Sequence, residues 1–147
     1  MSSEERTTGL FQNLENADMT HGFKNYMEQH PDTDAIKTFH DYINTYVATH
    51  EEISISYIAN HCGFGENYAR EIMRGDKNGS RDRIIALCIT AKMNLKETRR
   101  GLKLAGFGDL YPKIARDMAI IICINNECYN VGDVNDYLDK NGCETLK

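Results

Sequence analysis

The sequence predicts an all-α protein, and three observations lead to that prediction. Its 147 residues include only two prolines, at 31 and 112, and the long segments between them carry helix-forming residues. Apolar residues recur with the spacing of an amphipathic helix. An internal repeat then predicts two consecutive helical hairpins. The hydrophobic share of 41% is ordinary for a globular protein and argues against a disordered chain.

The first third of the chain is expected to contain three helices. Residues 1–7 are polar, and two short amphipathic helices follow before Pro31 breaks the chain. The apolar residues of these two helices are Leu10, Phe11, Leu14, Phe23, Tyr26 and Met27. A longer helix should begin at Asp32 or Thr33 and end near His50. Its core-facing residues recur at helical spacing: Ile36, Phe39, Ile43 and Val47.

Residues 57–75 predict two short helices joined by a tight turn. Apolar residues for a shared core occur on both sides of the turn: Ile58, Phe64, Ala69 and Ile72. The small side chain of Ala59 lets the helices cross closely, and Gly63 can adopt the positive φ of a tight turn. Ser54 or Ser56 can cap the first helix. The second helix leaves polar positions on its outer face: Gly65, Glu66, Asn67, Arg70, Glu71 and Arg74.

This pattern resembles the DNA-binding domain of the phage-repressor-like, or Xre-type, helix-turn-helix family. The resemblance covers roughly residues 33–93 and continues past the turn into a glycine-containing basic loop at 74–80 and a core helix at 81–91. The sequence departs from the family pattern at Met73 and Gly79, where family members often carry Glu and Pro. The resemblance implies a repressor-like helix-turn-helix bundle, which the second helical hairpin continues.

The resemblance also implies how the chain would contact double-stranded DNA. The first helix of the motif would cross the backbone, and the second would enter the major groove. Asn67 and Arg70 would contact base edges, because an amide suits adenine and a guanidinium suits guanine. Glu66 and Glu71 would accept hydrogen bonds from cytosine or exclude other sequences. Phosphate contacts are expected from Ser54, Ser56, Arg74, Lys77, Asn78, Ser80 and Arg81.

The distribution of charge agrees with a DNA-binding segment, although the net charge is −5. Residues 1–61 contain three basic and ten acidic side chains, and residues 116–147 contain three and six. Residues 62–115 contain eleven basic and six acidic side chains, so this segment alone is positive, at +5. A phosphate backbone responds to such a local field. The alternative is a chance cluster of charges on a helical surface.

Two segments in the second half of the chain repeat each other. Residues 81–89 and 116–124 share Arg-Asp, then Ile three residues after the Asp, then Cys-Ile. The similarity continues after one extra residue, because Asn94, Leu95, Thr98, Leu102 and Gly106 correspond to Asn130, Val131, Val134, Leu138 and Gly142. Each copy predicts a buried helix, a turn, an Asn-capped amphipathic helix and a terminal glycine. Two stacked hairpins of about 35 residues follow.

Neither an enzyme nor a membrane protein is expected. No Walker loop, GxGxxG, GxSxG, HExxH or calcium-loop pattern occurs, so no catalytic site and no cofactor are predicted. The five cysteines include no CxxC pair and the five histidines lack metal-ligand spacing, which favours free thiols and no metal. The longest apolar run, residues 118–124, is far shorter than the roughly 20 residues of a membrane helix, and no signal-peptide pattern occurs.

These observations lead to a functional hypothesis with one rival. We expect a cytoplasmic, sequence-specific DNA-binding transcription regulator. Its parts would be short N-terminal helices in residues 1–32, the helix-turn-helix domain in 33–107 and a helical hairpin in 108–147. The rival is a protein-interaction module that keeps the scaffold and binds a protein partner without DNA.

A homodimer is expected through the C-terminal hairpin, because residues 118–124 would be apolar on every side of a helix. The interface is predicted at Ile120, Ile121, Ile122 and Ile124. Paired helix-turn-helix domains would then contact two DNA half-sites about one helical turn apart. Alternatively, the N-terminal helices around Leu10–Met27 cover the same surface in a monomer.

Overall fold

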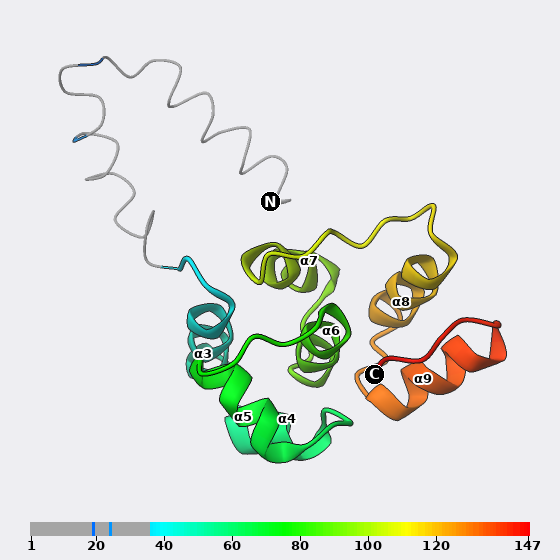
Figure 1. Cartoon of the computed structure of the whole chain (residues 1–147), viewed down its shortest axis with the longest axis horizontal. Helices are drawn as coiled ribbons and strands as arrows, with labels where there is room; N and C mark the ends of the chain where they lie inside the picture. The colour runs from blue at the N-terminus through cyan, green and yellow to red at the C-terminus, as the bar shows by residue number, and fades with distance from the viewer. Residues whose placement is uncertain (1–18, 20–23, 25–35) are drawn as a thin grey trace. The chain divides into compact units, whose positions relative to one another are not determined.

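A computed structural model describes residues 19, 24 and 36–147 of the chain (Figure 1). The chain divides into two units, Met1–Lys37 and Thr38–Lys147, and the helices labelled α3 to α9 belong to the second. The two short helices predicted near the N-terminus lie outside the described residues. The described part of the chain forms helices and no strand, which confirms the predicted all-α fold class.

The helices follow one another with short connections. Their bounds are α3 Phe39–Thr49, α4 Ile55–His61, α5 Glu66–Arg74, α6 Arg81–Thr90, α7 Leu95–Leu104, α8 Ala115–Asn125 and α9 Val131–Lys140. Helix α3 begins later than predicted, since Ile36 and Lys37 are not helical. Thr38 is extended and caps the helix by accepting a hydrogen bond from the Asp41 N–H at 3.2 Å. A local cap therefore sets this boundary, which apolar spacing placed too early.

Helix α6 lies at the centre of the core. Every residue from Ile84 to Thr90 is buried, and α6 packs against α4, α7 and α9. Figure 1 shows it in the middle of the other helices, and α3 packs against both α5 and α7. A helix that is apolar on all sides has to be surrounded, which explains why helices from both ends of this unit meet on α6.

Side chains that were predicted as caps define several helix starts. The hydroxyls of Ser54 and Ser80 each accept a backbone N–H, at 3.0 and 3.3 Å. Asn94 forms a capping box with Glu97, and Asn130 caps α9. Each cap satisfies N–H groups that the first turn of a helix leaves free. These predictions are confirmed.

The internal repeat folds into two helical hairpins, α6–α7 and α8–α9, as predicted. The hairpins pack reciprocally, because α6 contacts α9 and α7 contacts α8. If the hairpins α6–α7 and α8–α9 are interchanged, the contact between α6 and α9 becomes the contact between α8 and α7. The two copies of the repeat are therefore arranged as a pseudo-two-fold pair.

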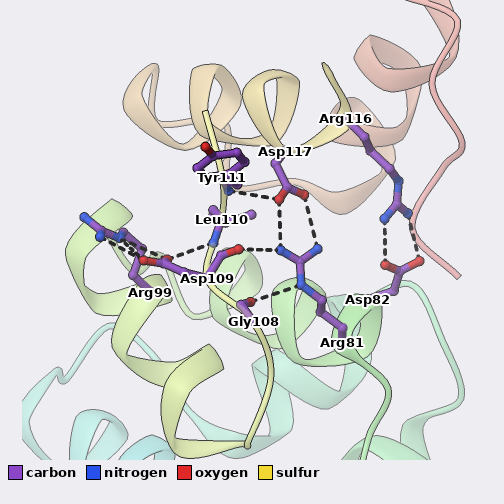
Figure 2. Close-up of polar contacts among 9 residues, drawn as sticks. All are labelled: Arg81, Asp82, Arg99, Gly108, Asp109, Leu110, Tyr111, Arg116 and Asp117. Atoms are coloured by element: carbon purple, nitrogen blue, oxygen red, sulfur yellow. Dashed lines mark hydrogen bonds and ion pairs between the residues drawn. The ribbon is translucent and has the colours of Figure 1, made fainter. Parts of the chain in front are cut away.

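The Arg-Asp pair that begins each copy of the repeat joins the two hairpins (Figure 2). Arg81 donates to both carboxylate oxygens of Asp117, at 3.2 and 3.1 Å. Arg116 donates to both carboxylate oxygens of Asp82, at 2.9 and 2.8 Å. Each arginine thus binds the aspartate of the other copy, and bidentate pairs of this kind fix orientation as well as distance. The repeat encodes a contact between its own copies.

The first of these ion pairs also anchors the connection between the hairpins. Asp117 is only 3% exposed, and it accepts the Tyr111 N–H at 2.9 Å. Arg81 donates to the carbonyl groups of Gly108 and Asp109, at 3.2 and 3.0 Å. The loop is thereby tied to the starts of α6 and α8 (Figure 2).

The second ion pair holds the residues that follow α9. Arg116 donates to the carbonyl groups of Glu144 and Thr145, at 2.8 and 2.9 Å, and Asp82 accepts the Lys147 N–H at 3.1 Å. Burial raises the pKa of Asp82, but the hydrogen bonds from Arg116 and Lys147 and the nearby positive charge outweigh it. The pKa of Asp82 therefore lies below its ordinary value of 3.8.

We expect Asp82→Asn to reduce the dependence of stability on acid pH. A carboxylate whose pKa is lowered by folding contributes stability that is fully present above the unfolded pKa, near 4, and is lost as the pH falls through the folded value. Wild-type protein should therefore lose this contribution below about pH 4, and the variant has none to lose. Urea unfolding between about pH 6 and pH 2 measures the difference, with Asp136→Asn on the exposed side of α9 as control. Parallel curves for Asp82→Asn and wild type would contradict it.

Candidate nucleic-acid interface

Helices α4 and α5 form the predicted pair of short helices with a tight turn. Residues 62–65 connect them, and Gly63 has a φ of +86°, as its position in the motif predicted. The inner faces of the two helices are buried at Ile58, Ala59, Ala69, Ile72 and Met73. Because so many inner side chains are apolar and the turn is short, the outer face of α5 is held in one orientation relative to the core.

The outer face of α5 presents polar side chains at helical spacing. Asn67, Glu71 and Arg74 are separated by four and three residues, so they share the side opposite the buried face. Asn67 and Arg74 are exposed, whereas Glu71 is half-buried. This row can donate to and accept from the edges of bases or of other polar groups.

The cations of this face are all paired with acids. Arg70 binds Glu66 at 3.1 Å and also donates to the Ser56 hydroxyl at 3.2 Å. Arg74 binds Asp76 at 3.0 Å, and Lys77 binds Glu71 at 3.2 Å. Exposed pairs of this kind contribute only about 0–1 kcal/mol, so an incoming phosphate can displace them. The pairs nevertheless cancel much of the local positive charge that the sequence predicted here.

The residues predicted to contact phosphate differ in the hydrogen bonds and ion pairs that they already form within the chain. Ser54 and Ser80 accept N–H groups as helix caps and keep their hydroxyl protons for other acceptors. Asn78 is exposed, and its carbonyl accepts the Tyr68 hydroxyl at 3.2 Å. Arg81 is committed to the ion pair between the hairpins and to two carbonyl groups of the loop. The guanidinium of Arg81 is thus engaged within the fold, and the phosphate contact predicted at Arg81 would require these bonds to open.

Tyr68 on α5 and Arg83 on α6, which the sequence did not single out, form an aromatic and cationic cluster with Phe64 and Lys77. The Arg83 guanidinium lies 4.6 Å from the Tyr68 ring centre and 5.7 Å from that of Phe64. Lys77 lies 5.5 Å from the Tyr68 ring centre. Phe64 is half-buried rather than part of the inner core as predicted, since its ring turns toward Tyr68. The spacing of four residues between the two rings was the available signal.

A second basic surface lies on α7. Four exposed basic side chains share one side of this helix, at Lys96, Arg99, Arg100 and Lys103. Arg99 binds Asp109 at 2.8 Å, and the Arg100 guanidinium lies 5.3 Å from the Tyr42 ring centre. Helix α7 packs against α3 and α6, and α5 packs against α3 and α4. Much of the positive charge of residues 62–115 is therefore on α7 and not on the outer face of α5.

The cysteine beside the turn is a structural residue. Cys62 is 1% exposed, and its thiol lies 3.6 Å from the carbonyl oxygens of Ala59 and Phe64. Burial raises the pKa of the Cys62 thiol and outweighs the opposing backbone hydrogen bonds, so the thiol stays protonated at neutral pH. No group of three or more potential metal ligands occurs among the described residues. The neighbouring cavity, of about 50 Å³, is smaller than the roughly 300–1,000 Å³ of small-molecule sites.

Comparisons of the chain with family models, curated proteins and solved structures find no match. No helix of the described residues is long and apolar enough to cross a membrane. What the protein binds has therefore to be inferred from the geometry of α4, the turn and α5.

Proposed function

We propose that this chain is a sequence-specific DNA-binding transcription regulator that contacts the major groove through α5. The observation that carries the proposal is the polar outer row of α5, held on a rigid pair of helices by the Gly63 turn. A helix presented in this way can enter a groove about 12 Å wide. The resemblance of residues 33–93 to the phage-repressor-like family supports the same function.

The positions of the side chains favour different roles within α5. Asn67 is exposed, and its amide suits bidentate contact with adenine. Arg74 is 61% exposed, and it can contact guanine once its ion pair with Asp76 opens. Arg70 is held at the flank by Glu66 and Ser56, so it would contact bases only after leaving both. Glu66 and Glu71 would accept hydrogen bonds from cytosine or exclude other sequences.

Phosphate contacts are assigned to the residues around the two helix starts. Ser54 and Ser56 lie at the start of α4, and Lys77, Asn78 and Ser80 lie in the loop between α5 and α6. Their hydroxyl, amide and ammonium groups can donate to phosphate oxygens. These contacts would position α5 without reading sequence.

Asn67→Ala should weaken binding to the preferred site by about 1–3 kcal/mol and relax the preference at one base pair. Lys77→Ala should weaken binding to all sequences alike and lower the salt slope by about one. Selection from random duplexes, followed by gel shifts at two salt concentrations, measures both effects. Lys140→Ala removes one positive charge from α9 and serves as the control. The absence of any salt-sensitive shift would reject the proposal.

A protein-interaction module remains the second candidate, and two observations favour it. The acids on and beside α5 already pair with its cations. The hairpin α8–α9 also leaves large apolar side chains exposed, and such clusters mark protein contacts. If the module binds protein alone, no duplex will be selected.

A further inference from the structure

The exposed large apolar side chains of the unit Thr38–Lys147 all lie in one short segment. Tyr111 and Ile114 are each 51% exposed, Met118 is 46% exposed and Ile122 is 40% exposed. Successive members from Ile114 onward are four residues apart, so they share one side of α8. We call these four residues the α8 stripe. Isolated exposed apolar residues are ordinary, whereas a contiguous row of them marks a contact surface.

The α8 stripe replaces most of the interface predicted from the sequence. Ile120 and Ile124 are 0% and 3% exposed, so they face the interior of their own chain and cannot contact another. Ile121 is half-buried, and only Ile122 of the predicted four is exposed. The reason is that α8 has two apolar sides, one of which packs against α7 and α9.

In the first copy of the repeat, other helices cover the side of α6 that is equivalent to the α8 stripe. Met118 and Ile122 follow the Arg-Asp pair by one and five residues, and their equivalents in α6 are Arg83 and Leu87. Leu87 is fully buried, α4 packs on α6, and Arg83 lies over rings of the helix-turn-helix. A helical pair therefore covers this side of α6. No helix covers the same side of α8 among the described residues.

We propose that a second copy of this chain covers the α8 stripe, with the two α8 helices antiparallel about a two-fold axis. Such an interface brings one patch against itself, which requires a self-complementary surface. Met118 of each copy would pack near Ile122 of the partner subunit, and the uncharged stripe leaves no buried charge unpaired. The pseudo-two-fold arrangement within the chain shows that helices of this kind can pack reciprocally.

Charge at the two ends of α8 selects the antiparallel orientation. Lys113 lies just before the helix and Glu127 just after it, and both are exposed. Neither forms an ion pair within residues 36–147. An antiparallel pair places Lys113 near Glu127 of the partner subunit twice, whereas a parallel pair would bring like charges together.

Sedimentation equilibrium of the full chain without DNA tests the dimer separately from DNA binding. Wild-type protein should be a dimer at micromolar concentration. Met118→Glu and Ile122→Glu should each raise the dimer Kd at least about tenfold, because each would bury an unpaired acid against an apolar side chain of the partner subunit. Ala48→Glu places the same acid at an exposed position on α3 and should leave the Kd unchanged. Circular dichroism should show wild-type helix content for all three variants.

A charge exchange tests the orientation. Lys113→Glu and Glu127→Lys should each weaken the dimer at low salt, and the double variant should restore it. Restoration by the double variant supports the antiparallel pair. A monomeric wild type, a dimer that both glutamate variants leave intact, or a double variant that stays as weak as the single ones would overturn the proposal.

Discussion

Asp117→Ala should destabilise the protein by about 3–5 kcal/mol, the usual cost of removing one partner from a buried ion pair. Asp117 is 3% exposed and accepts hydrogen bonds from Arg81 and from the Tyr111 N–H. Its loss leaves a partly buried guanidinium without its charge partner and frees the loop between the hairpins. The start of α8 would then lose its link to α6.

Urea unfolding followed by circular dichroism measures the loss, and a fall in melting temperature of at least about 10 °C should accompany it. Asp109→Ala is the matched control, because Asp109 also binds an arginine but is half-exposed. That change should cost less than about 1 kcal/mol. The double variant Arg81→Ala/Asp117→Ala should be more stable than the sum of its single changes predicts. Similar losses of stability in Asp117→Ala and Asp109→Ala would contradict the prediction that the buried ion pair contributes more to stability than the exposed one.

Gly63→Val should destabilise the protein by about 2–5 kcal/mol through two independent effects. Gly63 has a φ of +86°, a conformation that a β-branched residue adopts only with strain. A Cβ at this position would also lie 3.0 Å from Cγ1 of Val131 at the start of α9. The turn is therefore restricted both by its own backbone and by the C-terminal hairpin.

Thermal unfolding of a set of variants separates these effects. Gly108→Val is the control, because a Cβ there meets no atom within 4 Å and its φ is not positive. Gly63→Ala should destabilise less than Gly63→Val. The double variant Gly63→Ala/Val131→Ala should lose less stability than the sum of its single changes, because Val131→Ala removes the contact. If Gly63→Val melts like wild type, the strain at the turn is absent. At low temperature, where the Gly63→Val variant is still folded, its affinity for DNA should also be lower than that of wild type, since α5 would shift.

Features that depend on neighbouring residues were predicted well from the sequence. The caps at Ser54 and Ser80, the turn at Gly63 and the hairpins of the repeat all follow from groups within a few positions of one another. The start of α3 was misplaced because apolar spacing continued beyond the cap at Thr38. Local hydrogen bonding decided that boundary.

Features that depend on distant residues were not predicted. Arg81 looked like a phosphate contact because it follows a basic loop, yet its partner Asp117 lies 36 residues away. Both Arg-Asp pairs were visible as a repeat, but their reciprocal binding was not. The sequence predicts α5 as the candidate site. It does not predict the ion pairs between the cations near this helix and Glu66, Asp76 and Glu71, because these pairs depend on side-chain positions.

The all-α class, most helix starts and the repeated hairpin can be predicted from the sequence, because hydrogen bonds and apolar spacing within a few residues specify them. Which side of α8 is interior depends on tertiary packing. Residues 118–124 are apolar all round, so their composition cannot distinguish the side that α7 and α9 cover from the side that stays exposed. Packing between the hairpins buries one side of α8, and this packing depends on side chains that are far apart in the chain.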